Sequence, residues 1–123
     1  MLKRILIVDD NPQMRRLMRF FINSQPGFEV CGEGLDGLDA VEKAVALKPD
    51  LIILDFRMPR LNGIEAAHVL RESLPYVPII LFTLHKDTIS ESELANSGIR
   101  AVLSKTDGIA LLAGQLHRLL PDA

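Results

Sequence analysis

Short, wholly apolar runs alternate along the chain with longer segments whose apolar residues recur every three or four positions. The runs have the length of strands, and those without polar residues are typical of strands buried on both faces of a parallel sheet. This pattern predicts five strands, at residues 5–8, 28–31, 51–54, 79–82 and 101–103. Helical spacing is clearest after the first run, in the stripe of Met14, Leu17, Met18, Phe21 and Ile22.

Residues that start or end helices separate these segments. Each helix is preceded by a side chain that can accept a hydrogen bond from the free N–H groups of the first turn. The five predicted starts are Asn11-Pro12, Asp36, Asn62-Gly63, the capping box from Ser90 to Glu93, and Asp107. Proline or glycine then ends most of the helices, the second one at about Lys48 and the short fourth one at Gly98.

The order of elements is therefore a strand and a helix repeated five times. Such alternation predicts an α/β fold with right-handed crossovers and helices on both faces of a parallel sheet. The runs at 5–8, 51–54 and 79–82 are the most apolar, so we expect these three strands at the centre. The result is a flavodoxin-like (βα)5 three-layer sandwich with strand order 2-1-3-4-5, formed by residues 1–123 as one domain.

Composition narrows the class of protein. Lys and Arg number 14 and Asp and Glu number 16, a net charge of −2, so the chain lacks the basic excess of a nucleic-acid-binding surface. The longest apolar runs are four or five residues, whereas a membrane span needs about 20. One cysteine excludes an internal disulfide and a zinc cluster of several cysteines. We expect a soluble, cytoplasmic domain.

Polar side chains follow four of the predicted strands. Asp9 and Asp10 come after the first strand, Asp55 after the third, Thr83 after the fourth and Lys105 after the fifth. In an open α/β sheet the carboxyl ends of the strands form the ligand-binding edge, so these groups should converge there. Each residue alone has an ordinary explanation, as a turn or cap aspartate or a surface lysine, but together they indicate one site.

The chemistry of these groups suits phosphoryl transfer. Three carboxylates in one place repel one another, and both Lys105 and a divalent cation would relieve that repulsion. Mg²⁺ favours one or two carboxylates, water and a phosphate oxygen. A carboxylate can also accept a phosphoryl group and form an acyl phosphate. Lys105 would then neutralise one phosphoryl oxygen, and the Thr83 hydroxyl would donate to another.

Taken together, these residues resemble the receiver domain of bacterial two-component response regulators over the whole chain. The resemblance implies that Asp55 is phosphorylated and that Asp9 and Asp10, with Asp55 and the backbone carbonyl of Arg57, hold Mg²⁺. It also implies that Thr83 is the switch hydroxyl and that Lys105 pairs with the phosphate. The matching segments are Ile7-Val8-Asp9-Asp10-Asn11, Leu54-Asp55-Phe56-Arg57-Met58-Pro59, Leu61-Asn62-Gly63, Thr83 and Ser104-Lys105.

The same resemblance implies partners. The phosphoryl donor would be a phosphohistidine on a sensor histidine kinase, and the switched surface would lie near the fourth helix, the fifth strand and the fifth helix. Lys105 is followed by Thr106-Asp107 and not by proline, which is similar to regulators of the nitrate-regulator type, with a helix-turn-helix output. The resemblance implies that the output would be a DNA-binding domain or a protein target, and the sequence leaves homodimerisation open. We expect no enzyme activity beyond phosphoryl acceptance and slow hydrolysis of the aspartyl phosphate.

Two positions depart from the usual receiver pattern. Val102 stands where receivers carry an aromatic residue, and bulky Leu84 follows the switch hydroxyl where a small residue is usual. We expect Leu84, with Arg57, to slow access of water or small phosphodonors to Asp55. These departures keep open a receiver that signals without phosphorylation.

Two other classes of protein fit these residues less well. An aspartyl-phosphate hydrolase would need an acid where this chain has Arg57. A flavin carrier would need a hydroxyl-rich and glycine-rich first loop, not Asp9-Asp10-Asn11-Pro12.

The first helix should also present an outer face. Phe20 lies away from its apolar stripe, on a surface that resembles the kinase-docking surface of receivers. Arg15, Arg16 and Arg19 share this outer face, and we expect them to be solvated. Leu111 similarly points away from the stripe of the last helix. Either it belongs with Val102 to a partner or dimer surface on the last helices and the fifth strand, or it is a lone exposed side chain.

Overall fold

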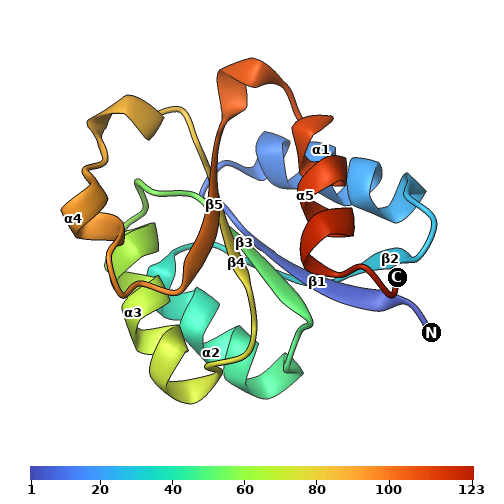
Figure 1. Ribbon diagram of the computed structural model, residues 1–123, viewed down its shortest axis with the longest axis horizontal. Coiled ribbons are helices and arrows are strands. Elements are labelled where there is room, and N and C mark those ends of the chain that lie inside the picture. The colour runs from blue at the N-terminus through green and yellow to red at the C-terminus, as the bar shows by residue number, and fades with distance from the viewer.

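Five parallel strands form one sheet in the computed structural model of residues 1–123 (Figure 1). Their order is β2-β1-β3-β4-β5, as the sequence predicts. The residues of β3 and β4 are all buried, as are the last four of β1, which explains why these central strands read as continuous apolar runs. The strands are β1 (Lys3–Val8), β2 (Phe28–Gly34), β3 (Leu51–Leu54), β4 (Ile79–Thr83) and β5 (Ile99–Ser104).

Helices cover both faces of the sheet and complete a three-layer sandwich. Figure 1 shows α1 and α5 on one face, with α2 and α3 on the other. Successive strand residues point to opposite faces, so Ile5 and Ile7 pack with α1 and α5 while Leu6 and Val8 pack with α2 and α3. The helices are α1 (Pro12–Ser24), α2 (Gly37–Leu47), α3 (Gly63–Ser73), α4 (Glu91–Leu94) and α5 (Leu111–Leu119). None of them is long and apolar enough to cross a bilayer.

Four of the five predicted helix starts are confirmed. The side chains of Asn11, Asp36, Asn62 and Ser90 each accept a hydrogen bond from a backbone N–H of the first turn, the last two within capping boxes. The prediction for Asp107 was wrong. That residue ends a 3-10 turn that begins at Lys105, and α5 starts later, at Leu111, without a side-chain cap.

Two further predictions need correction. Leu17 belongs to the apolar stripe of α1 by spacing, but 47% of its surface is exposed because Met18 and Ile22 occupy the buried face. Strand β2 is longer than its apolar run and continues through Gly32 and Gly34 along the edge of β1. Pairing with β1, rather than side-chain hydrophobicity, therefore sets the end of this strand.

Helix α3 begins in direct contact with the loop that follows β3. The N–H of Gly63 donates to the carbonyl of Phe56 at 2.7 Å. A Cβ atom at Gly63 would lie only 2.2 Å from the carbonyl oxygen of Asp55 and 2.8 Å from a methyl carbon of Leu81. Glycine at this position therefore allows the first turn of α3 to close against the backbone of the Asp55 loop.

Substitution of Gly63 by alanine should destabilise the fold, because the added methyl group meets backbone that cannot move freely. We expect the free energy of unfolding to fall by roughly 1–3 kcal/mol, measured by urea unfolding followed by circular dichroism. Gly114→Ala is the matched control: it lies in α5 with open space around it, and alanine there should add about 0.5–1 kcal/mol. Equal effects of the two substitutions would contradict this account.

Candidate functional site

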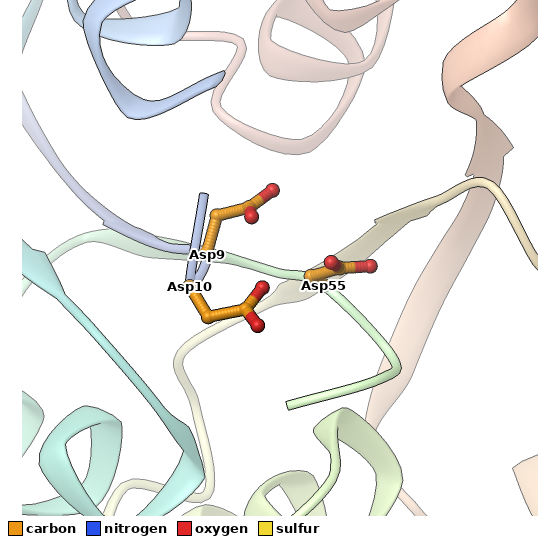
Figure 2. Close-up of side chains that lie close together, drawn as sticks. All are labelled: Asp9, Asp10 and Asp55. Atoms are coloured by element: carbon orange, nitrogen blue, oxygen red, sulfur yellow. The ribbon is translucent and has the colours of Figure 1, made fainter. Parts of the chain in front are cut away.

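Three carboxylates lie together at the carboxyl edge of the sheet. Asp9 and Asp10 follow β1, and Asp55 follows β3, whose last residue Leu54 pairs with Val8. One ligand atom from each aspartate lies within 4.8 Å of those of the other two. Figure 2 shows the three side chains extending from two neighbouring strand ends to the same side. Asp9 and Asp55 are buried, whereas Asp10 is exposed.

Lys105 provides the positive charge of this cluster. Its Nζ lies 2.6 Å from Oδ2 of Asp9 and 3.2 Å from Oδ2 of Asp55, and only 7% of its side chain is exposed. Because Lys105 follows β5, the sheet brings together groups 96 and 50 residues apart in sequence. The lysine bridges the two buried aspartates and leaves Asp10 without an ion-pair partner.

Asp55 carries the electrostatic strain of the cluster. Burial raises the pKa of its carboxyl group above the usual value, and the negative charge of Asp9 raises it further. Lys105 and the N–H of Phe56, which donates to Oδ1 of Asp55 at 2.7 Å, lower this pKa in part. The carboxylate is therefore costly to ionise in the absence of a further cation.

The donor set fits a hard divalent cation. Three carboxylate oxygens can converge, and oxygen ligands of this kind are the ones that Mg²⁺ prefers. The acids line a cavity of about 260 Å³, and Arg57 lies on its wall. That wall position is compatible with a ligand role for the Arg57 carbonyl, which stays a prediction.

Thr83 lies deeper than the other predicted site residues. Its side chain is fully buried at the end of β4, and its hydroxyl oxygen accepts the N–H of His85 at 3.1 Å. The cavity next to the aspartates is lined by Leu84 and His85 instead of Thr83. The role of Thr83 as a phosphoryl-contacting hydroxyl stays a prediction.

Leu84 and Val102 differ in their surroundings. Leu84 lies on the cavity wall with 61% of its surface exposed, at the position from which it can obstruct the approach to Asp55. Val102, in β5, is partly buried and packs against the core on the α2 and α3 face of the sheet. The expectation that Val102 contributes to a partner or dimer surface was therefore wrong, because its side chain fills a core position, whereas the leucine lines the cavity.

One expectation about α1 was wrong. Arg15 and Arg19 are not simply solvated, because both pair with Glu33 of β2, at 3.1 and 2.6 Å. Arg15 also donates from Nη1 to the backbone carbonyl of Asp9 at 2.7 Å, so it contacts the backbone of the acidic cluster. The i, i+4 spacing of the two arginines indicates a shared face, but their partner lies on an edge strand and only tertiary structure reveals it.

The chain is similar to known proteins over most of its length. A family model described as the response regulator receiver domain matches residues 5–116. A curated protein-glutamate methylesterase/protein-glutamine glutaminase of Thermotoga maritima is 38% identical over 115 residues. That alignment covers 92% of this chain but only 33% of the methylesterase, so the chain corresponds to one part of that longer protein.

Solved structures of response regulators have the same fold as this chain. A two-component response regulator of the LuxR family from Aurantimonas is 27% identical, with a TM-score of 0.90 over 99% of this chain and 87% of that one. The response regulator TrrA of Thermotoga maritima, solved in complex with Mg²⁺–BeF, is 30% identical. Its TM-score is 0.85 over 97% of this chain and 100% of that chain.

The raised pKa of Asp55 makes a prediction about stability. Because its pKa is higher in the folded than in the unfolded chain, the folded protein binds more protons between the two values, and stability falls as pH rises through this window. Asp55→Asn, which cannot ionise, should therefore be more stable than the wild type at pH 7 without metal. The difference should shrink as pH falls toward the ordinary aspartate pKa.

Urea unfolding in EDTA between pH 4 and pH 8 measures this difference. Asp122→Asn, an exposed aspartate near the end of the chain, removes the same charge and should leave the pH profile unchanged. An Asp55→Asn protein no more stable than the wild type at neutral pH would show that burial does not strain this carboxylate.

Proposed function

The chain belongs to the response regulator receiver domain family, and we propose that residues 1–123 act as a phosphorylation-controlled signalling domain. In this proposal Asp55 accepts a phosphoryl group, and Asp9, Asp10, Asp55 and the carbonyl of Arg57 hold Mg²⁺. The observation that supports it most strongly is the convergence of three carboxylates with the nearly buried Lys105 at one edge of the sheet. The related TrrA structure contains Mg²⁺–BeF, which favours the same chemistry here.

Phosphoryl transfer needs positioning and charge stabilisation more than covalent assistance. A carboxylate oxygen of Asp55 would attack the phosphorus of a phosphohistidine. A P–O bond forms, the P–N bond breaks, and the imidazole leaves with the electron pair of that bond. When bound, Mg²⁺ would offset the negative charges of the carboxylates and of the phosphoryl oxygens.

Residues of the chain would orient Asp55 and bind the phosphoryl oxygens. The N–H of Phe56 orients Asp55 through its hydrogen bond to Oδ1. Lys105, already 3.2 Å from Oδ2 of Asp55, would pair with one phosphoryl oxygen. The Thr83 hydroxyl would move toward another phosphoryl oxygen and draw the segment after β4 with it. This movement would shift a pre-existing equilibrium of the surface around α4, β5 and α5.

The proposed donor is a phosphohistidine on a sensor histidine kinase. Phe20 on α1 is 78% exposed, as predicted, and offers an apolar contact on the proposed kinase-docking surface. The proposed output is a DNA-binding domain or a protein target, since the chain resembles both LuxR-family regulators and a part of a methylesterase.

Labelling with acetyl phosphate tests the assignment of the acceptor. We expect the wild type to gain one phosphoryl group in the presence of Mg²⁺ and Asp55→Asn to gain none, as measured by intact-mass spectrometry. Asp122→Asn should be labelled like the wild type. Stoichiometric labelling of Asp55→Asn would refute the proposal. A wild type that takes no label and binds no beryllofluoride with Mg²⁺ would favour the alternative, a receiver that signals without phosphorylation.

Leu84 makes a second prediction about the same reaction. Because its side chain lies on the cavity wall, Leu84→Ala should open the approach to Asp55 and speed labelling or hydrolysis. We expect an acceleration of roughly two- to fivefold, equivalent to about 0.4–1 kcal/mol in the activation barrier. Leu111→Ala, which truncates an exposed leucine on α5, is the control and should react at the wild-type rate. Unchanged rates for Leu84→Ala would exclude the obstruction.

A further inference from the structure

Arg15 lies between Glu33 and the backbone of Asp9, and we propose that the Arg15–Glu33 pair is a positioning device for the metal site. By holding the peptide between Asp9 and Asp10, the pair sets the direction in which the Asp10 carboxylate points. This inference rests on the proposed function, since it concerns how the same site binds Mg²⁺. It gives two residues outside the acidic cluster a role in metal affinity.

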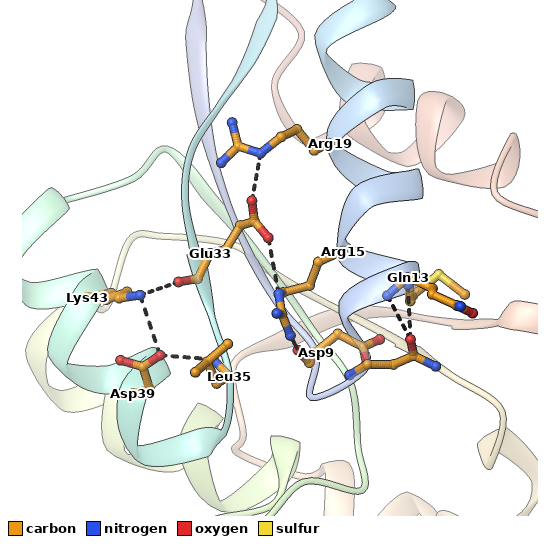
Figure 3. A network of polar contacts seen from close by, with 10 residues as sticks. Asp9, Gln13, Arg15, Arg19, Glu33, Leu35, Asp39 and Lys43 are labelled. Carbon is orange, nitrogen blue, oxygen red and sulfur yellow. Dashed lines mark hydrogen bonds and ion pairs between the residues drawn. The ribbon is translucent and has the colours of Figure 1, made fainter.

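The geometry of Arg15 fixes it at both ends. Its Nε donates to Oε1 of Glu33 at 3.1 Å, and its Nη1 donates to the carbonyl of Asp9 at 2.7 Å (Figure 3). Only 15% of the side chain is exposed, so water competes little for these contacts. A planar guanidinium can make both bonds at once, which an ammonium group cannot do in the same geometry.

Hydrogen bonds hold the peptide groups on both sides of the Asp9 Cα atom. The N–H of Asp9 donates to the carbonyl of Gly34 at 3.1 Å, while its own carbonyl accepts from Arg15. The N–H of Asn11 donates to Oδ1 of Asp9 at 2.9 Å. Asp10 is exposed and has no ion pair of its own. The backbone therefore fixes the direction of the Cα–Cβ bond of Asp10 and so limits the positions that its carboxylate can reach.

Glu33 is itself anchored from two helices. Its second carboxylate oxygen accepts from Nε of Arg19 on α1 at 2.6 Å. Its backbone carbonyl accepts from Nζ of Lys43 on α2, which also lies 3.5 Å from Asp39 (Figure 3). The network connects α1, β2 and α2 to the first metal-ligand segment. Contacts that hold ligands in this way typically change metal affinity by roughly 10- to 100-fold when they are removed.

A positioning role and a simple charge effect predict opposite changes in Mg²⁺ affinity when Arg15 is removed. As a positive charge near the acids, Arg15 repels Mg²⁺, so its removal by charge alone would tighten metal binding. As a positioning residue, Arg15 preorganises the ligands, so its removal would weaken binding. The direction of the change therefore decides between the two interpretations.

Isothermal titration calorimetry of the full chain with MgCl₂ tests the proposal. We expect Arg15→Ala to bind Mg²⁺ roughly tenfold more weakly than the wild type. Arg15→Lys, which keeps the charge but not the planar fork, should also bind more weakly. Arg16→Ala is the matched control, because it removes the same charge from the neighbouring, exposed position and should bind at least as tightly as the wild type.

Urea unfolding in EDTA shows whether each variant is folded. If Arg15→Ala does not fold, the comparison of Arg15→Lys with the wild type tests the proposal. Unchanged or tighter binding by the folded Arg15 variants, with normal binding by the wild type, would overturn the positioning role and leave the proposed function intact. Failure of both the wild type and Arg16→Ala to bind Mg²⁺ would instead overturn the proposed function, and the positioning role with it.

Discussion

Mutual repulsion among three carboxylates is the constraint on which this site depends. The sheet places Asp9, Asp10 and Asp55 together, and one lysine is not enough to balance them. Burial makes the imbalance worse at Asp55, whose pKa it raises. In the proposed function, the remaining negative charge is what would attract a divalent cation to these three carboxylates. In the proposed function the same excess of acid, offset by metal, is what admits a phosphoryl group.

The fold supplies this crowding through its most hydrophobic parts. The central strands β1 and β3 are held by buried side chains on both faces, so their carboxyl ends cannot separate to relieve the repulsion. The backbone of the Asp55 loop is held further by the close approach of Gly63. Lys105 adds a link to β5, at the far edge of the sheet. In the proposed function, a phosphoryl group on Asp55 would therefore change the charge next to Lys105 and so reach the end of β5, two strands away.

Most of this architecture follows from local patterns in the sequence. Apolar runs predicted which strands are central, and the full strand order came in part from the known flavodoxin-like topology. The strand-end aspartates and Lys105 predicted which residues meet. The sequence could not predict features that depend on contacts between elements. Asp107 has the side chain of a helix cap, but the preceding 3-10 turn delays α5. Arg15 has the pattern of a solvated arginine, but Glu33 on the edge strand turns it toward Asp9.

The central claim is that the three carboxylates share one divalent cation. The most direct test replaces Mg²⁺ with paramagnetic Mn²⁺ and follows backbone amide signals by nuclear magnetic resonance. The account predicts that signals of Asp10, Asn11 and Phe56 broaden first. Signals of Gly27 and Gly98, which precede the amino-terminal ends of β2 and β5, stay sharp. Broadening centred elsewhere, or none at millimolar Mn²⁺, would contradict it.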